Sequence, residues 1–225
     1  MSPRNLILSL AGSLVLASIA RGDFSTTFSV PPYQLDATVI GIDGWEPRMP
    51  DPASTGLSAR VQAIRWNNNV PALVLNQASL KNAFPATTGT KVQVTVKLAA
   101  AFPLPGAQLQ QLRIIISGAP FGEIVFDPGP EGGFGFGDGG GRKTQVIVPV
   151  NQVKPNSFYT FSILVNYDAM TYDLSVTGEK KDGTPFTHEA KAVNFETKKT
   201  TMDSLLILTG RQINAYVGEI SLQSQ

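Results

Sequence analysis

The chain has 225 residues, of which 16% are charged, and its 18 Lys and Arg side chains nearly balance its 17 Asp and Glu side chains, giving a formal net charge of +1. So small a net charge creates no strong field to steer the protein to nucleic acid or to an anionic membrane, and we expect neither as a partner. The absence of cysteine excludes disulfides, thiol nucleophiles, zinc–thiolate sites and iron–sulfur clusters.

The N-terminal sequence MSPRNLILSLAGSLVLASIARG predicts a secretory signal peptide. It has a basic start at Arg4, an apolar run over residues 6–20 and small residues before Arg21. The run is shorter than the roughly 20 residues that cross a bilayer. We expect cleavage after Ala20, with the site after Gly22 as the alternative. The mature chain, residues 21–225, is then exported to the periplasm, the cell surface or the medium, without a transmembrane segment.

Alternation of apolar and polar residues predicts strands along the whole mature chain. In VQVTVKL, residues 92–98, the valines and the leucine take one face. The segments FYTFSILVNY and YDLSV alternate in the same way on either side of the short break DAMT, which predicts an antiparallel hairpin. Further strands are expected at residues 24–30, 57–66, 72–75, 112–117, 123–126, 144–150, 186–195, 205–208 and 215–222.

These segments predict an all-β fold in one domain, residues 21–225. The 21 glycines and 16 prolines suit short strands joined by turns, and no long window after the signal peptide has the 3.6-residue period of a helix. Many short strands without alternating helices favour an antiparallel two-sheet β-sandwich over a parallel βαβ fold. No repeat of fixed period is present, so a propeller or solenoid is not expected.

The glycine-rich stretch FDPGPEGGFGFGDGGGRK, residues 126–143, contains GxGxxG at Gly135, Gly137 and Gly140. A dinucleotide site needs a helix after this motif, because the helix N-terminus holds the pyrophosphate. Here TQVIVPV follows, which alternates as a strand and contains Pro149. The sequence therefore excludes a Rossmann site and predicts a long connection between two strands, on the rim of the sandwich.

Two interpretations of this stretch stay open. Asp127, Glu131 and Asp138 offer the hard oxygen ligands that calcium prefers, and the backbone between them can add carbonyl groups. The alternative is a solvated loop whose carboxylates face water. Calcium is the one cofactor that the sequence suggests.

Two groups of residues are candidates for sugar binding, which needs an aromatic face and a few groups that pair with hydroxyls. The first is Trp66 with Asn67, Asn68 and Asn69, at the end of a predicted strand. The second is Trp45 with Tyr33, for which a structural role at the edge of the core is the preferred interpretation.

Three phrases resemble bacterial secreted proteins of the concanavalin A-like lectin/glucanase class, with LamG-like jelly rolls: DFSTTFSVPPYQLDATVIGIDGWEP, FYTFSILVNYDAMTYDLSVTG and TMDSLLILTGRQINAYVGEISLQ. The resemblance implies a jelly roll in which the first and last strands pair. It also implies that Glu219 is an acidic ion ligand, with Asp23 close to it if the first and last strands pair, although Gly218 stands where an Asp is expected before Glu219.

The glucanases of that class carry catalytic carboxylates in the order Glu, Asp, Glu at alternating positions of one strand. In this chain the nearest match is Glu123, Val125 and Asp127, so the motif is broken and no catalytic residue is assigned.

The sequence therefore favours a secreted, non-catalytic binding or cell-surface module that takes a polysaccharide or cell-surface glycan. One alternative is a polysaccharide-degrading enzyme, a glycoside hydrolase or lyase, on the same fold. Another is a structural matrix or assembly protein that self-associates.

Overall fold

The structure is a computed structural model that describes residues 23–29, 31–48, 59–75, 78–101, 111–137, 144–196, 199–210 and 214–225. The predicted signal peptide, residues 1–20, and Asp138 lie outside the described residues. Within them, no helix combines the length and the apolar character needed to cross a membrane.

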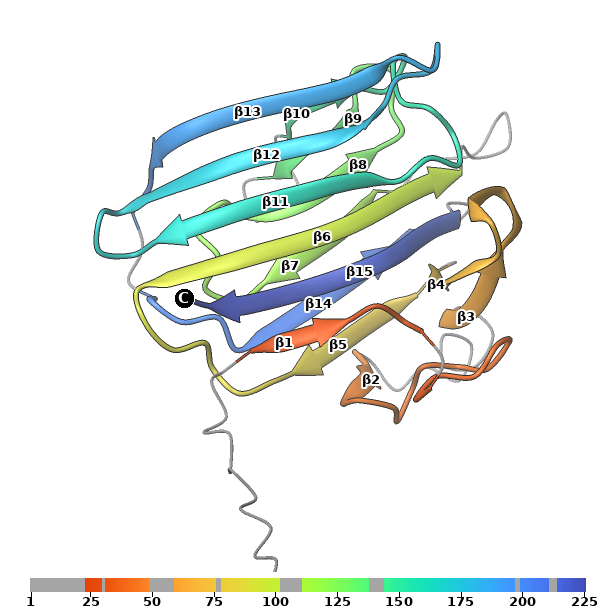
Figure 1. Ribbon diagram of the computed structural model, residues 1–225, viewed down its shortest axis with the longest axis horizontal. Helices are drawn as coiled ribbons and strands as arrows, with labels where there is room; N and C mark the ends of the chain where they lie inside the picture. Colours follow the sequence, from red (N-terminus) through yellow and green to blue (C-terminus); the bar gives the residue numbers. More distant parts are fainter. Residues whose placement is uncertain are drawn as a thin grey trace, which may run out of the picture.

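Two antiparallel sheets lie face to face, as Figure 1 shows, which confirms the predicted sandwich. The front sheet, nearer the viewer, has eight strands in the order β13-β12-β11-β6-β15-β4-β3, and β1 also pairs with β15. Its strands are β1 (Phe24–Thr26), β3 (Ala59–Ile64), β4 (Val70–Leu75), β6 (Lys91–Ala101), β11 (Tyr159–Asn166), β12 (Thr171–Glu179), β13 (Pro185–Asn194) and β15 (Asn214–Ser224), and the 3-10 turn η1 (Arg65–Asn67) precedes β4.

The back sheet has seven strands in the order β10-β9-β8-β7-β14-β5-β2. Its strands are β2 (Trp45–Pro47), β5 (Ser79–Ala83), β7 (Leu112–Ile116), β8 (Glu123–Asp127), β9 (Gly133–Gly137), β10 (Thr144–Pro149) and β14 (Ser204–Thr209). The segments predicted as strands are all present with small shifts of their ends. The sequence analysis missed β2, β5 and β9.

Two strand pairings were predicted, and both are confirmed. Strands β11 and β12 form the expected hairpin, with Ile163 opposite Leu174. The first and last strands also pair, with Phe24 opposite Leu222. The first strand therefore closes against the last in the front sheet.

The core lies between the sheets and is built by the inward-facing residues of both. Alternate residues of β11 are buried, which is the pattern of a strand with one face in the core. From the back sheet, the ring of Phe134 packs against those of Phe126 and Tyr159 at centroid distances of 4.7 and 4.8 Å. Buried side chains of both sheets thus form one continuous cluster.

The glycine-rich stretch is where the sequence prediction was wrong. Residues 133–137 form β9, paired with β8 on one side and β10 on the other, instead of part of a loop. The sequence Gly-Phe-Gly-Phe-Gly alternates with period two, so Phe134 and Phe136 enter the core and the glycines take the other face. The rejection of a nucleotide site stands, because the strand β10 follows.

Candidate functional site

Trp45 and Tyr33 lie inside the core, so their prediction as sugar-binding rings is wrong. Trp45 is fully buried and Tyr33 is 2% exposed. The indole Nε1 of Trp45 donates a hydrogen bond of 3.2 Å to the hydroxyl oxygen of Tyr33. Phe28 packs on both rings at centroid distances of 5.4 and 5.9 Å. The pair therefore has the structural role that the sequence interpretation preferred for Trp45.

The other sugar candidates lie in the turn between β3 and β4. Asn68 and Asn69 are exposed and have φ angles of 52° and 59°, so they form the left-handed part of the turn. The amide of Asn69 donates to the carbonyl oxygen of Ile64. The backbone of Trp66 lies in η1 and Asn67 is partly exposed, but the Trp66 side chain lies outside what the structure describes. This site stays a prediction.

The predicted calcium ligands are not brought together within the described residues. Both carboxylate oxygens of Asp127 accept hydrogen bonds of 2.8 Å, from Gln111 Nε2 and from the amide of Gly129. Glu131 is exposed, and Asp138 is not described. In the described ranges no three His, Cys, Asp or Glu side chains form a group that can share a metal ion. A calcium site that includes Asp138 therefore stays a prediction.

The pairing of the first and last strands does not place Asp23 beside Glu219. Oδ1 of Asp23 accepts a hydrogen bond of 2.7 Å from the amide of Ser224. Glu219 lies five residues earlier in β15, roughly 16 Å away along an extended strand. The expectation that strand pairing brings these two carboxylates together is therefore wrong.

Glu123 is a fully buried carboxylate on the face of the back sheet that points away from the core, which we call the outer face. Ile124 and Phe126 enter the core, so Glu123, Val125 and Asp127 share the outer face. Arg113 on β7 holds Glu123 Oε2, with Nη2 at 2.6 Å and Nε at 2.7 Å. The other oxygen, Oε1, is buried and has no hydrogen-bond partner among the described residues.

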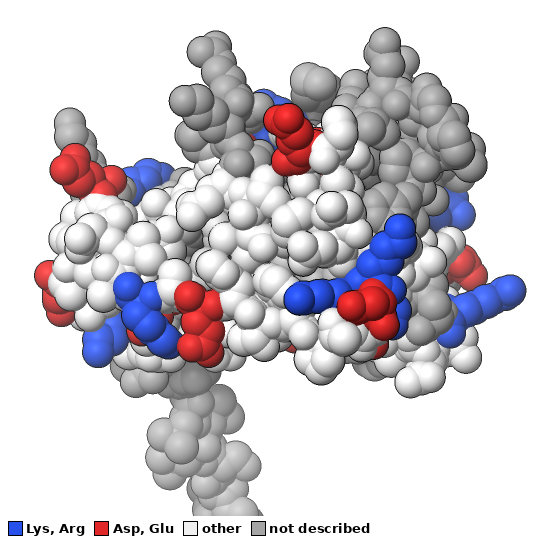
Figure 2. Space-filling model, turned by 90° about the horizontal axis from the view of Figure 1, so that it is seen from above, with Lys and Arg blue, Asp and Glu red and all other residues white. Residues whose placement is uncertain are grey.

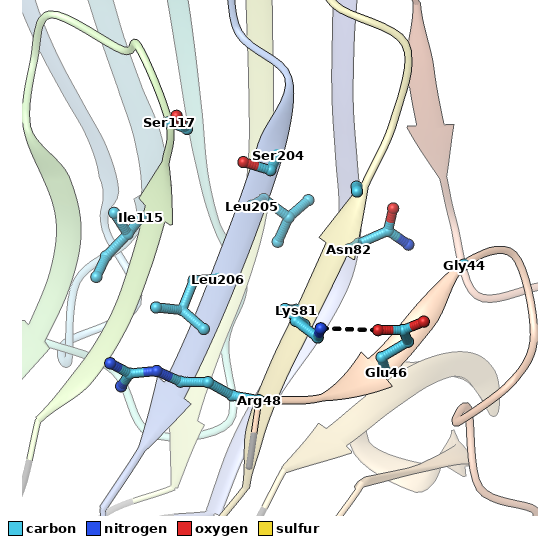
Figure 3. A pocket seen from close by; sticks show the side chains of 11 residues that line it. Gly44, Glu46, Arg48, Lys81, Asn82, Ile115, Ser117, Ser204, Leu205 and Leu206 are labelled. Atoms are coloured by element: carbon cyan, nitrogen blue, oxygen red, sulfur yellow. Dashed lines mark ion pairs between the residues drawn. The ribbon is translucent and has the colours of Figure 1, made fainter.

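A first pocket, of about 540 Å³, lies on the outer face and crosses β2, β5, β14 and β7. Figure 3 shows its labelled side chains. We call it the outer-face pocket. It is lined by Gly44, Glu46, Arg48, Lys81, Asn82, Ala83, Ile115, Ser117, Ser204, Leu205 and Leu206.

A second pocket, of about 470 Å³, lies where the turn between β7 and β8 meets the ends of β9, β10, β12 and β13. We call it the rim pocket. It is lined by Pro120, Phe121, Gly122, Phe136, Gly137, Gln145, Tyr172, Asn194, Phe195 and Glu196. Four of these side chains are aromatic and three carry an amide or a carboxylate.

The aromatic rings of the rim pocket are held by one another. Phe121 meets Phe136 and Tyr172 edge to face, at centroid distances of 5.8 and 6.3 Å. Tyr172 stacks on Phe195 at 6.4 Å with the ring planes 27° apart. Phe121 and Phe136 are almost fully buried, whereas Tyr172 and Phe195 stay partly exposed. The pocket therefore has an aromatic wall of fixed position that is open to solvent.

The rim pocket also has exposed polar side chains. Gln145, Asn194 and Glu196 are exposed, and in the described part of the chain no hydrogen bond or ion pair occupies their side chains. Burial raises the pKa of the Tyr172 hydroxyl above 10.0, so this group is a neutral donor at pH 7.

Sequence reasoning missed this site. Its signal was the phrase Asn194-Phe195-Glu196 at the end of a predicted strand, where an aromatic residue stands between two polar ones. The other wall comes from Phe121 and Gln145, which only the fold brings near.

Charges on the surface show no patch of one sign on the face that Figure 2 presents. Lys and Arg side chains lie beside Asp and Glu side chains around its edge, and most of the described surface between them is uncharged. Recognition on this face therefore depends on local groups instead of a long-range field.

Comparisons with known proteins concern the fold. Neither protein-family models nor curated proteins give a match to the chain. Among solved structures, the catalytic domain of a glycoside hydrolase family 131 protein from Coprinopsis cinerea is 11% identical, with 80% of this chain and 83% of that chain covered and a TM-score of 0.49. Peanut lectin is 9% identical, with 89% and 95% covered and a TM-score of 0.47.

A third similar structure is the marine PL-14 alginate lyase from Aplysia kurodai, 8% identical, with 69% of this chain and 83% of that chain covered and a TM-score of 0.41. At these identities the likeness concerns the fold, and function is argued from this chain's own residues.

Proposed function

We propose that the protein is a secreted, non-catalytic carbohydrate-binding module and that the rim pocket holds the sugar. The single observation that carries the proposal is the combination, in one pocket, of partly exposed aromatic rings with exposed amide and carboxylate groups. Sugar rings present an apolar C–H face and a rim of hydroxyls, so they need both kinds of group. Export rests on the N-terminal sequence, and N-terminal sequencing of the exported protein should begin at Arg21.

Each wall of the rim pocket has a role in this proposal. The rings of Tyr172 and Phe195 supply the surface on which a sugar ring packs. The amides of Gln145 and Asn194 can both donate to and accept from hydroxyls, and the Glu196 carboxylate accepts from them. Because the aromatic rings are fixed by mutual contact, little conformational entropy is lost on binding.

The carboxylates on β8 support binding instead of hydrolysis. A glycosidase needs two carboxylates that are free to reach the scissile bond from either side. Asp127 has both oxygens occupied by Gln111 and Gly129, and Val125 stands between it and Glu123. Arg113 binds Glu123 in addition.

The enzyme alternative keeps one observation in its favour, which is the unpartnered oxygen Oε1 of Glu123 on the outer face. A reducing-end and unsaturated-uronate assay on mixed polysaccharides tests it. Turnover that Glu123→Gln abolishes, with Glu46→Gln unchanged and both variants folded, would establish the enzyme. We expect no turnover.

A glycan array, run once with calcium and once with EDTA, tests the proposed function. We expect retention of the mature protein on a subset of glycans, and loss of retention in Tyr172→Ala. The matched control is Phe158→Ala, which removes another partly exposed ring, one that packs under Lys97 outside the rim pocket. Retention lost with EDTA would support the calcium prediction. No retention on any glycan would overturn the proposal.

A further inference from the structure

The outer-face pocket is separate from the rim pocket and has a different chemistry. Its floor is apolar, formed by Ile115 of β7 and Leu206 of β14, which are both partly exposed. Ser117 and Ser204 lie at one end of this floor, and charged side chains lie at the other, as Figure 3 shows. At about 540 Å³ it has the size of a small-ligand site.

Two cations border this floor, and one of them forms an ion pair with Glu46. Lys81 Nζ lies 2.8 Å from Glu46 Oε2. Arg48 is exposed, and within the described residues no ion pair engages its guanidinium. In Figure 3 the Arg48 side chain extends over β14 beside Leu206. A guanidinium in this position offers two parallel donors to a carboxylate above the floor.

Asn82 adds a buried acceptor without a partner. It lines the pocket and is 1% exposed, and its Nδ2 donates 2.8 Å to the carbonyl oxygen of Asp43. That bond fixes which end of the amide is the oxygen. Oδ1 has no partner among the described residues. Asn82 takes the inward side of β5 together with the core residue Leu80, so this oxygen faces away from a ligand on the outer face.

Gly44 lies beside Asn82 at the edge of the pocket. A Cβ at Gly44 would lie 3.5 Å from Asn82 Oδ1, but glycine places no side chain there. The φ of Gly44 is +79°, a conformation that residues with side chains rarely adopt.

We propose that the outer-face pocket is a second sugar site, and that it takes a uronate residue of an acidic glycan. The Arg48 guanidinium pairs with the ring carboxylate, and the C–H face of the ring packs on Leu206 and Ile115. The inference deepens the proposed function by naming a ligand class, and it rests on carbohydrate being the ligand.

The turn over residues 117–122 separates the two pockets and is held firmly. Ser117 borders the outer-face pocket, whereas Phe121 and Gly122 border the rim pocket. The hydroxyl of Tyr167 donates to the carbonyl oxygen of Gly118 at 3.1 Å, and Lys199 Nζ donates to Ser117 Oγ at 2.8 Å. One turn therefore fixes one edge of each site.

The test is calorimetric titration of the mature protein with tetramers of galacturonate, mannuronate and glucuronate, and with the methyl esters of the same tetramers. The esters keep the ring and the hydroxyls but lose the charge. We expect at least one acid to bind roughly fivefold more tightly than its ester, the scale of an exposed charge pair. Arg48→Gln should weaken the acid by about the same factor and leave the ester unchanged.

Two further variants make the result specific. Arg48→Lys should retain most of the preference for the acid, because it keeps the charge. Lys191→Gln removes the same charge from β13 at the far edge of the front sheet and should change nothing. Equal binding of acid and ester, or equal effects of Arg48→Gln and Lys191→Gln, would overturn the inference.

Comparing Tyr172→Ala with Arg48→Gln shows which of the two proposals has failed. If this variant loses glycan binding while Arg48→Gln loses no preference for acids, the uronate site is wrong and the rim-pocket proposal stands. If Arg48→Gln loses the preference while Tyr172→Ala binds every glycan normally, the rim-pocket proposal is wrong and the uronate site stands.

Discussion

At the scale of single residues, Arg113 and Glu123 form an ion pair of 2.6 Å in the back sheet whose carboxylate is fully buried. The Glu123 side chain is fully buried and that of Arg113 is 23% exposed. Loss of Arg113 leaves a buried carboxylate without its cation, so Arg113→Gln should lower the free energy of unfolding by about 3–5 kcal/mol. Urea denaturation measures this change.

The comparison for Arg113→Gln is an ion pair of similar length near the surface. Lys154 Nζ lies 2.7 Å from Glu179 Oε2, with side chains 37% and 40% exposed. Lys154→Gln should cost less than about 1 kcal/mol. The double variant Arg113→Gln, Glu123→Gln should recover part of the stability lost in Arg113→Gln. Equal costs for the two single variants would contradict this account of burial.

Tyr167 predicts a loss of stability in alkali. Its hydroxyl is buried, and burial raises its pKa to about 12 from 10.0. Unfolded tyrosine ionises near pH 10, so the buried neutral hydroxyl stabilises the fold fully below pH 10.0, and this contribution is lost as pH rises to about 12. Over this pH window, the midpoint temperature of thermal unfolding should fall more steeply in the wild type than in Tyr167→Phe. Parallel curves would contradict the assignment.

Single residues also show where sequence reasoning stops. The Trp45–Tyr33 pair was one of two sugar candidates, and its burial follows from contacts with Phe28 that no local pattern reveals. Asn82 occupies an inward position of β5, and its Nδ2 donates to a carbonyl group 39 positions away, at Asp43. Residue types and alternation predict faces of strands, whereas such pairings come only from the fold.

At the scale of elements, β9 is a strand that glycine makes possible. A Cβ on Gly135 would overlap the backbone oxygen of Gln145, and one on Gly137 would overlap the Glu123 carboxylate. Gly135 therefore allows β10 to approach β9 closely, and Gly137 leaves room for the Glu123 side chain. Glycine density alone suggested a loop, but the alternating phenylalanines identify the strand.

Gly135→Ala should separate β10 from β9. We expect a cost of about 1–3 kcal/mol, because the added methyl meets backbone that cannot yield locally. Hydrogen exchange should speed up at residues 144–149 and stay slow in β11. Gln145→Ala, an exposed change in the same strand pair, should leave exchange as in the wild type. Unchanged protection in Gly135→Ala would show that the close approach does not matter.

Most other strands followed from alternation, and the exceptions have local causes. Strand β2 has only three residues and contains Pro47. Strand β5 places Asn82 inward, where alternation leads one to expect an apolar side chain. These two missed strands carry much of the outer-face pocket, which the sequence therefore did not suggest.

At the scale of the whole molecule, the sandwich leaves β13 at one end of the front sheet. Its ladder with β12 shifts register between Tyr172 and Leu174, and Ala192 has a positive φ of 49°. Glu189 and Lys191 add charges along it. Bulges and charges protect an edge strand from pairing with another chain.

We therefore expect light scattering of the mature protein to give the mass of one chain at all concentrations. A mass that rises with concentration would contradict this expectation. It would favour the alternative of a self-associating matrix or assembly protein.

The central claim is that a glycan binds in the rim pocket, and an amide NMR titration with an array-selected glycan tests it most directly. We predict that the shifted signals gather at Phe121, Gln145, Asn194, Phe195 and Glu196, which are distant in sequence and share only this pocket. Shifts confined to Trp66, Asn67, Asn68 and Asn69, or no shifts with any glycan, would contradict the claim.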